Sequence, residues 1–339
     1  MKPKNKTKVG RLKHLATTLL CVLPNIVMAQ KETILFHNCE NFFFPTNDSI
    51  KEDDEYTVTG KKHWTWFRFE KKRDALAKTY IAAGEGIFPV LIGLCEVEGT
   101  KVLDALCFDS PLSKGHYKYV HYPSQDVRGI DVALLYNEKR FKLLESSQIT
   151  PEITDNDEPT RDVLYVKGTL SSNRSVNIYV IHAPSRRENN IKQHLRESIF
   201  AMIKEHIDSL HQKGENNFII MGDMNDNPWD ESILNGFQTD VKNGNEPFLV
   251  NLMQFNKGKA GSYYYDGDLF SFDQFIISRN LTSQIVYPTP LDKTHIFKPK
   301  FLQNRDPRVK KEIPFCTYKR HKYLGGVSDH FPIILHIEL

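Results

Sequence analysis

The sequence predicts an α/β protein in which sheets and helices pack in layers within one domain. Short apolar runs of strand length recur along the chain and alternate with two stretches of helical periodicity. The chain has no internal repeat, low-complexity tract or linker rich in Gly, Ser or Pro. Its 339 residues are 40% hydrophobic and 26% charged, which excludes an intrinsically disordered chain and a polytopic membrane protein.

Strands are expected where apolar and β-branched residues run between turn residues. The expected strands are Thr33–His37, Val90–Leu94, Ile130–Tyr136, Phe141–Ser147, Val163–Leu170, Asn177–Ile181, Asn217–Met221, Phe272–Ser278 and Phe331–Ile337.

Helices are expected over Asn189–Gln212 and Phe69–Ala83, where apolar residues recur every three or four positions. The first helix has one apolar stripe made of Ile191, Leu195, Ile199, Ile203 and Leu210. The second has a stripe made of Phe69, Leu76 and Tyr80, with Lys71, Lys72 and Arg73 expected off that face.

The first 29 residues are predicted to be a secretory signal peptide, which leaves one domain over residues 30–339. Six basic residues lie within the first thirteen, and the apolar run Leu15–Val27 that follows is too short and interrupted for a membrane span. Val27 and Ala29 are the small residues expected before a cleavage site. An uncleaved anchor helix and lipoprotein processing at Cys21 are the weaker alternatives. The mature protein is therefore expected to be exported, to the periplasm or beyond.

The net charge of the whole chain is +3, with 45 Lys and Arg against 42 Asp and Glu. The predicted signal peptide holds six basic and no acidic residues, so the mature chain keeps 39 basic and 42 acidic residues, a net charge of −3. Overall charge therefore gives no argument for binding to nucleic acid.

The mature chain keeps four cysteines, Cys39, Cys95, Cys107 and Cys316. They are too few for a disulfide framework, and none has the spacing of a zinc site. Cys39 and Cys95 lie in apolar runs and are expected to be buried thiols. A single disulfide stays open in an exported protein.

Polar residues gather at the ends of the expected strands. Four strands run into such residues at their carboxyl ends and two begin with them. The residues are Asn38, Glu40, Glu96, Glu98, His182, Asp223, Asn225, Asp273, Asp329 and His330. If the last two strands run antiparallel to the first four, all these side chains meet at one edge of the sheet core. By strand period Asn38 and Glu40 share one face, as do Asp223 and Asn225.

This edge collects carboxylates, amides and histidines, with no nucleophilic serine elbow. Oxygen donors suit a hard cation such as Mg²⁺ or Mn²⁺, which commonly binds carboxylates together with phosphate oxygens. A histidine beside an aspartate is suited to general base catalysis on water. The combination indicates metal-assisted hydrolysis of a phosphate ester.

Each motif alone also has a purely structural reading. Asn38 suits a turn cap, Glu96 a salt bridge, and His182 a buried core histidine. The Gly-Asp-Met-Asn-Asp segment suits a turn, and Ser328–His330 suits a loop before the last strand. Their recurrence at successive strand ends favours the functional reading.

The chain resembles the endonuclease/exonuclease/phosphatase superfamily, also called DNase I-like. The resemblance runs along nearly the whole mature chain. It rests on NCENFF, GLCEVE, RGIDVALLY, IHAPSRR, GDMNDNP, FDQFIIS and GVSDHFP, and is nearest to secreted bacterial members. It implies a four-layered α/β sandwich, with two central mixed β-sheets flanked by helices.

The resemblance also implies roles for the residues at the strand ends. Metal binding falls to Glu96 as the principal ligand, with Asn38 and Asp329. The catalytic set is His182, Asp223, Asn225, Asp273 and His330. In this set Asp273 orients His330, Asn225 contacts the scissile phosphate and His182 donates to the phosphate or the leaving oxygen. Either Asp223 or His330 accepts the proton of water, and the choice stays open because coupled groups titrate together.

The substrate is expected to be a phosphate ester, with nucleic acid favoured. Residues 293–322 hold ten basic and two acidic residues, a local charge of +8 between two strands of the expected site. Such a segment suits a polyanionic backbone, although a solvated surface loop is an equal alternative. Arg128, Arg186 and Arg187 adjoin the motifs and are the expected phosphate-binding arginines.

A second basic cluster, Lys61–Arg73, interleaves cations with Trp64, Trp66, Phe67 and Phe69. It suits stacking of bases, transient contact with lipid, or simply the start of a core helix. Three functions therefore stay open: an exported nuclease, a sphingomyelinase-like phosphodiesterase or phosphatase, and a catalytically inactive binding protein. No protein partner is implied.

Overall fold

The computed structural model describes residues 31–153, 158–186, 190–240, 246–286, 294–308 and 310–338. The predicted signal peptide, residues 1–29, and the predicted phosphate-binding Arg187 lie outside the described residues. Within them, no helix combines the length and the apolar character needed to cross a bilayer.

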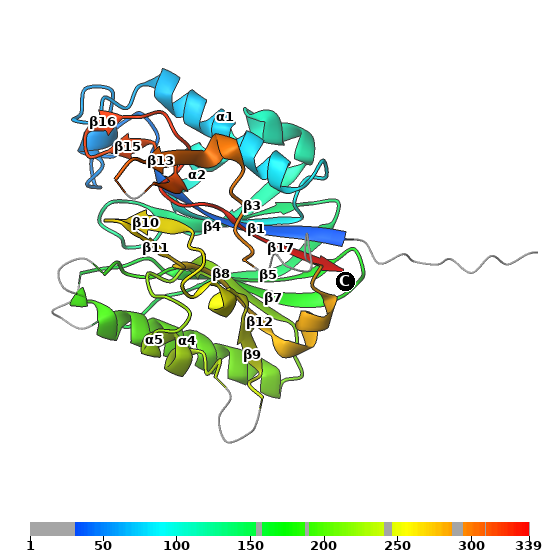
Figure 1. Cartoon of the computed structure of the whole chain (residues 1–339). Helices are drawn as coiled ribbons and strands as arrows, with labels where there is room; N and C mark the ends of the chain where they lie inside the picture. Colours follow the sequence, from blue (N-terminus) through cyan, green and yellow to red (C-terminus); the bar gives the residue numbers. More distant parts are fainter. Residues whose placement is uncertain are drawn as a thin grey trace, which may run out of the picture.

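Two sheets stack face to face at the centre of the molecule (Figure 1). The first sheet has the order β17-β1-β2-β4-β3, with bounds Ile333–Glu338, Lys31–Phe42, Leu91–Val97, Asp131–Asn137 and Tyr117–His121. The second has the order β5-β6-β7-β8-β12-β9, with bounds Phe141–Ile149, Val163–Leu170, Ser175–His182, Phe218–Asp223, Asp273–Ser278 and Leu249–Asn251.

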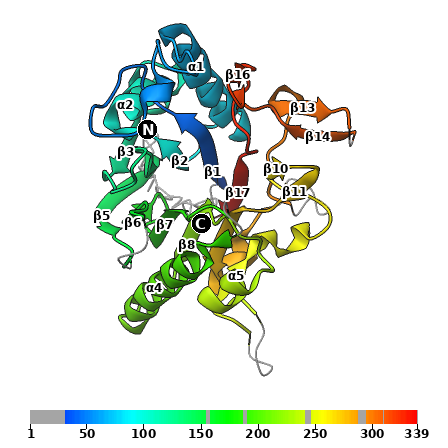
Figure 2. The ribbon, with the colours of Figure 1, turned by 90° about the vertical axis from the view of Figure 1, so that its left-hand side faces the viewer.

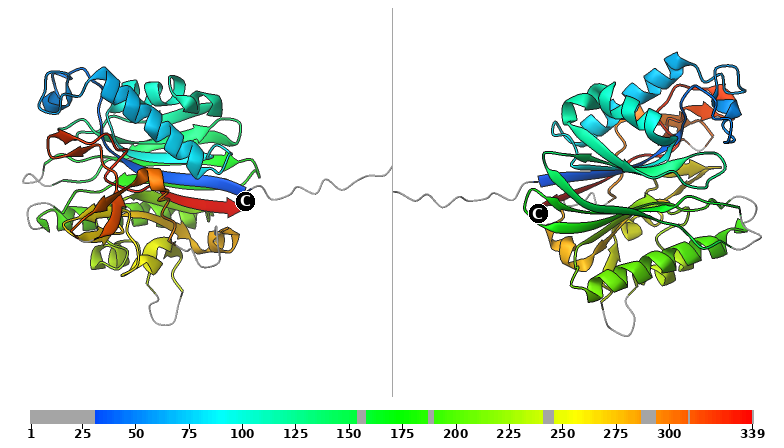
Figure 3. Two further views of the ribbon diagram at one scale, coloured as in Figure 1. Left: turned by 45° about the horizontal axis from the view of Figure 1, so that its top comes forward. Right: turned by 180° about the vertical axis from the view of Figure 1, so that it is seen from behind.

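Helices cover the outer faces of both sheets (Figure 3). Helices α1 (Trp66–Ala83) and α2 (Gly99–Phe108) lie outside the first sheet. Helices α4 (Gln193–Gln212) and α5 (Glu231–Gly236) lie outside the second. The protein is thus a four-layered α/β sandwich with two mixed sheets, as predicted.

Three small hairpins and short helical turns extend from these layers. The hairpins are β10–β11 (Tyr263–Tyr265 and Asp268–Phe270), β13–β14 (Gln303–Asp306 and Lys311–Pro314) and β15–β16 (Tyr318–Lys319 and Lys322–Tyr323). The turns are Asp54–Tyr56, Pro111–Gly115, Leu252–Asn256, Arg279–Gln284 and Lys300–Leu302.

Strand direction brings the polar strand ends together. β1 runs parallel to β2 in the first sheet, and β7 runs parallel to β8 in the second. β17 is antiparallel to β1, and β12 is antiparallel to β8. The carboxyl ends of four strands and the starts of the other two therefore meet at one end of the molecule, which faces the viewer in Figure 2.

Both predicted long helices are present, but the burial of one residue in each was predicted wrongly. Thr65 caps α1 by accepting a hydrogen bond from Arg68 N at 3.4 Å. Lys72 is buried on the inner face of α1, because it lies three residues after Phe69 on the same stripe. Ile191 precedes the first turn of α4 and is 64% exposed, so the buried stripe starts at Leu195.

The strand alternation expected after Asn38 is broken. Glu40 and Asn41 have φ of 50° and 52°, so β1 departs from regular extended backbone at its carboxyl end. Asn38 hydrogen-bonds Asp223, whereas the Glu40 carboxylate accepts from the backbone N–H groups of Thr317 and Tyr318. The expected pairing of Asn38 with Glu40 on one face was therefore wrong.

The four cysteines within the described residues are free thiols. Cys39, Cys95 and Cys107 are buried, and Cys316 is partly buried. Burial raises the pKa of Cys39 to about 12, so this thiol stays protonated and packs as an apolar group. The prediction of buried thiols at Cys39 and Cys95 is confirmed.

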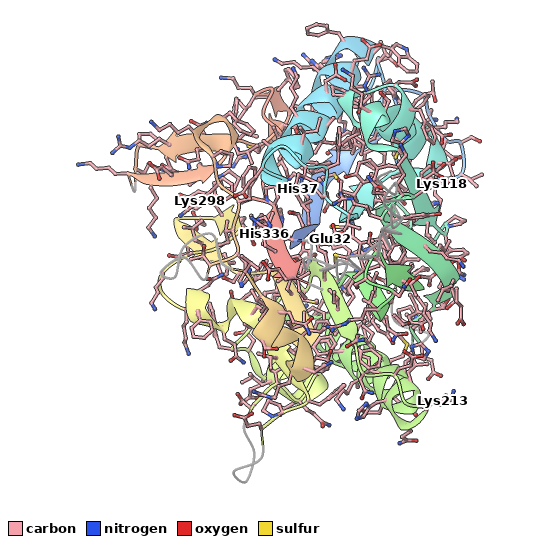
Figure 4. All side chains as sticks on the ribbon, turned by 90° about the vertical axis from the view of Figure 1, so that its right-hand side faces the viewer. Glu32, His37, Lys118, Lys213, Lys298 and His336 are labelled. Atoms are coloured by element: carbon pink, nitrogen blue, oxygen red, sulfur yellow. The ribbon has the colours of Figure 1, made fainter. Side chains whose placement is uncertain are left out.

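Acid is expected to destabilise the end of the sandwich opposite the site, where Figure 4 shows His336 beside Glu32. His336 is 2% exposed and shares a 2.9 Å hydrogen bond with Thr33, and burial lowers its pKa to about 4. In the unfolded chain a histidine titrates near pH ~6.5, so between these values only the unfolded state binds the proton. The free energy of unfolding should fall by about 2 kcal/mol between pH 7 and 4.5 through this residue. Urea titrations of the protein and of His336→Gln check this; an identical pH dependence in both would contradict it.

Candidate functional site

His330 and Asp273 form the first pair at the site. His330 lies just before β17 and Asp273 opens β12, and His330 Nδ1 is 2.7 Å from Asp273 Oδ2. Both side chains are buried, at 6% and 1% exposure. His330 N is held by Ser328 Oγ, which itself donates to the Asn38 carbonyl. The start of β17 is therefore fastened to the end of β1, and the imidazole is oriented by a carboxylate.

Asp223 lies at the centre of the polar cluster. Its Oδ2 atom accepts a hydrogen bond from Asn38 Nδ2 at 3.1 Å and lies 3.8 Å from Nε2 of both His182 and His330. Its Oδ1 atom accepts from the backbone N–H of Asn225 at 3.0 Å. One carboxylate thus joins side chains from both sheets.

Asn225 follows β8 in a left-handed conformation, with φ of 51°. Its side chain donates to the carbonyl of Ala183 at 2.9 Å, next to His182. This conformation suits asparagine better than most residues and turns the chain directly after Asp223. The Gly-Asp-Met-Asn-Asp segment is thus both a turn and part of the site.

Glu96, the residue before the last of β2, has a left-handed conformation, with φ of 57°. Glu96 Oε2 accepts from Asn41 N at 2.7 Å, and Oε1 lies 3.8 Å from His182 Nε2. Among the described residues no Lys or Arg forms an ion pair with it. A structural salt bridge from Glu96 to Lys or Arg is therefore absent from the described part of the chain.

Burial and the crowding of acidic groups raise the pKa of two carboxyls at the site. Burial raises the pKa of Asp223 to about 6, against the opposing charge of His330. The pKa of Asp329 is also raised to about 6. Burial is the main cause, and the negative charge of Glu96 adds to it, while the positive charge of His330 opposes the shift. The Asp329 side chain nevertheless keeps 40% of its surface open to solvent. These carboxylates repel one another, and the cluster is open to solvent at Asp329.

The two histidines are shifted in opposite directions. Burial lowers the pKa of His330, but Asp273, Asp223 and Asp329 together raise it well above its usual value. Burial lowers the pKa of His182 well below its usual value, and the guanidinium groups of Arg161 and Arg128 add to this. Burial therefore favours the neutral form of the His182 imidazole, whereas the three carboxylates favour the protonated form of His330.

The donor set fits a hard divalent cation. Glu96 and Asp329 supply carboxylate oxygens with Asp223 behind them, and a cation among them would stabilise the charged carboxylates against the burial and repulsion that raise the pKa of Asp223 and Asp329. Asn38 Oδ1 accepts from Glu40 N at 2.9 Å and keeps a second lone pair. Asn38, Glu96 and Asp329 are the side chains that would hold it.

A second group of possible ligand atoms converges beside this set. Atoms of Asp223, Asp273 and His330 lie within 4.8 Å of one another, all buried. His330 Nδ1 and Asp273 Oδ2 already bond each other, however, so two of these ligand atoms are occupied. The oxygen donors of Glu96 and Asp329 suit a cation better.

The loop that carries Arg128 is anchored by an arginine that sequence reasoning missed. Arg161 is buried and forms a 2.8 Å ion pair with Asp126. It also donates to the carbonyls of His182 and Ala183. Arg128 follows Asp126 with 36% of its side chain exposed, so this predicted phosphate-binding group is available at the rim. The only sequence signal for Arg161 was a basic residue directly before a strand.

Removal of Arg161 is expected to cost stability as well as activity. Arg161→Met removes the closest cation from buried Asp126 and leaves it only the partly exposed Arg128, whose Nε is 3.7 Å away. Loss of one partner of a buried pair typically costs ~3–5 kcal/mol of unfolding free energy. Urea denaturation measures this, and the double variant Asp126→Asn/Arg161→Met should recover most of the loss. A single variant as stable as the protein itself would show that the pair does not hold the loop.

Arg186 is used within the protein more than predicted. Its guanidinium pairs with Asp226 and Asp230 and lies 5.3 Å from the Phe272 ring centroid. Asp226 also pairs with the fully buried Arg196 at 2.7 Å. With 33% of its side chain exposed, Arg186 borders the site, and its phosphate role stays a prediction.

Glu40 and Lys72 connect α1 to the segment before the last strand. Lys72 Nζ donates to the Glu40 carbonyl at 2.6 Å and to Thr317 Oγ1 at 2.7 Å. In turn the Glu40 side chain accepts from the N–H groups of Thr317 and Tyr318. Glu40 thus positions this segment, and both of its carboxylate oxygens already accept hydrogen bonds.

The sequence matches a known protein family. Residues 33–339 match the profile described as the Endonuclease/Exonuclease/phosphatase family. The chain belongs to this family. Its members are hydrolases that act on phosphoester bonds, and they generally depend on a divalent metal ion. No curated protein matches the sequence significantly.

Solved structures of the same superfamily share the fold. A family protein from Bacteroides thetaiotaomicron has 15% identity and a TM-score of 0.57, with 91% of this chain and 95% of that chain covered. A mannosyl-6-phosphatase of the same species has 14% identity and a TM-score of 0.54, covering 90% and 98%. D. rerio TDP2, complexed with a single-strand DNA product, has 14% identity and a TM-score of 0.54, covering 91% and 99%. At these identities the likeness concerns the fold alone.

Proposed function

We propose that this protein is an exported, magnesium-dependent phosphodiesterase that cleaves nucleic acid by attack of water on phosphorus. The observation that carries the proposal is the convergence of Glu96, Asp329 and Asp223 beside the Asp273–His330 pair. Such a site offers oxygen donors for a cation and an oriented imidazole.

Each side chain has a distinct role in the proposal. Asn38, Glu96 and Asp329 would hold Mg²⁺ or Mn²⁺, which when bound would supply positive charge to stabilise the phosphoryl oxygens. Asp223 and His330, whose closest atoms are 3.8 Å apart, take the proton of water as a coupled pair.

The remaining residues bind the phosphate. Asn225 contacts the scissile phosphate, and neutral His182 donates to it or to the leaving oxygen. Arg128 contacts a flanking phosphate from the rim. Direct attack by water leaves no covalent intermediate on the protein.

Nucleic acid is the favoured substrate because of charge beside the site. The β13–β14 hairpin and its flanks carry Lys298, Lys300, Arg305, Arg308, Lys310 and Lys311. Figure 2 shows this hairpin projecting at the end of the molecule where the polar strand ends meet. Cations on such a projection suit a polyanionic backbone.

The test is a substrate panel with the purified mature protein and Mg²⁺. Plasmid DNA, RNA, sphingomyelin vesicles and bis-p-nitrophenyl phosphate are compared at equal phosphoester concentration. Hydrolysis of DNA or RNA is expected, with a rate on the polymers that falls steeply as salt is added. Hydrolysis of the lipid alone would overturn the proposal. Amino-terminal sequencing of exported protein should begin at Gln30.

A further inference from the structure

The β10–β11 hairpin carries a strip of aromatic rings on one of its faces. Tyr263 pairs with Phe270 across the hairpin, and Asp266 and Gly267, both with positive φ, form its turn. The Tyr263 and Tyr265 rings are 12° from parallel with centroids 6.5 Å apart, as side chains two positions apart on one strand face allow. The ring centroid of Phe272 lies 5.6 Å from that of Tyr263 and 5.0 Å from that of Phe270.

The inner end of this strip touches the proposed catalytic site. The Tyr263 ring stacks on His330, with centroids 4.5 Å apart and planes 25° from parallel. The two residues also form a backbone β-bridge, and Phe331 N donates to the Ser262 carbonyl at 2.7 Å. The strip therefore has a fixed position relative to the His330 imidazole.

The outer end of the strip is open to solvent. Tyr265 is 65% exposed, and Tyr263 and Phe270 are partly exposed, whereas Phe272 at the base is buried. Aromatic residues that serve only a core are buried, so exposed rings in a row that begins at the site suggest contact with a ligand.

The other face of the hairpin is joined to the basic hairpin. Tyr264 points away from the strip by strand alternation, and its hydroxyl donates to Asp306 of β13 at 2.9 Å. Lys311 Nζ donates to the Gly267 carbonyl at 3.1 Å. Figure 2 shows the two hairpins side by side next to β17. Cations and rings are thereby presented together.

We propose that Tyr263, Tyr265 and Phe270 form a stacking platform for a nucleobase next to the scissile phosphate. The proposal rests on the proposed function and names the part of the substrate that is recognised. Single-stranded nucleic acid is bound in this way by other proteins, with bases on aromatic rings and the backbone along cations. A lipid tail would leave the adjoining Lys and Arg side chains without a phosphate row to contact.

The test compares two matched substrates that differ only in one base. One is a short single-stranded oligonucleotide, and the other has an abasic tetrahydrofuran at the nucleotide beside the cleaved bond. Stacking on one ring is worth ~1–3 kcal/mol, so Tyr265→Ala should lower the preference for the base-bearing substrate by about 5- to 160-fold in kcat/KM. Tyr265→Trp should restore it. Phe108→Ala, an exposed aromatic at the end of α2, is the matched control.

A binding measurement separates this inference from the proposed function. An oligonucleotide with 2-aminopurine should lose fluorescence on binding to the full protein without Mg²⁺, and Tyr265→Ala should remove that quenching. Quenching that is followed by no hydrolysis once Mg²⁺ is added would overturn the proposed function and leave the platform standing. The platform would be overturned if Tyr265→Ala left the preference for the base-bearing substrate unchanged. It would also be overturned if Tyr265→Ala abolished binding to sphingomyelin vesicles but kept the quenching.

Discussion

Replacement of Glu96 by Ala is expected to lower phosphodiester hydrolysis by about 10³-fold at saturating Mg²⁺. Glu96 is the proposed principal ligand, and charge stabilisation by a bound cation is typically worth several kcal/mol of activation free energy. Its carboxylate accepts only one backbone hydrogen bond, from Asn41, among the described residues. The variant should therefore unfold within a few degrees of the protein itself.

The measurement is the initial rate on the best substrate of the panel, together with the melting temperature. Glu98→Gln is the matched control, because Glu98 lies in the same segment but bonds Phe44 N at 2.5 Å, outside the cluster around Asp223. Glu98→Gln should retain most activity, since an amide oxygen still accepts that bond. Full activity in Glu96→Ala would contradict the assignment of this residue.

Replacement of His330 by Ala is expected to lower kcat by about 10²–10⁴-fold, the usual contribution of one general acid or base. The imidazole faces Asp223 on one side and Asp273 on the other, so its loss removes both the proton-transfer partner and the charge between the two acids. KM should change much less than kcat.

Asp273→Asn provides a graded comparison for this prediction. It keeps the shape of the partner and removes the charge that holds the imidazole, so its loss of kcat should be smaller than that of His330→Ala. Steady-state kinetics of both variants check this. If His330→Ala retained wild-type kcat, water activation by the Asp223–His330 pair would be excluded.

The positions of the strand-end residues were predictable because they follow from local patterns. An apolar run ends where a polar residue begins, and chain order with strand direction sets which ends meet. Glu96, Asp223 and His330 came from that reasoning, and the structure brings them together from three strands. The fold class followed from the same apolar runs and the two helical stripes.

The supporting residues were not predictable in this way, because their partners are distant in sequence. Buried Lys72 is stabilised by hydrogen bonds to Glu40 and Thr317, and buried Arg161 by its ion pair with Asp126. No local sequence pattern predicts either contact. The β10–β11 hairpin had a usable signal, three tyrosines before an Asp-Gly turn, but its position against His330 depends on tertiary packing. The left-handed backbone of Glu40 is likewise set by tertiary contacts.

The central claim is that this site hydrolyses phosphodiesters with a divalent cation. The most direct measurement is the rate of oligonucleotide cleavage by the purified protein after removal of metal with EDTA, and again after Mg²⁺ is added in excess. The account predicts loss of cleavage by about 10³-fold in EDTA and full recovery with Mg²⁺. Undiminished cleavage in EDTA would contradict it.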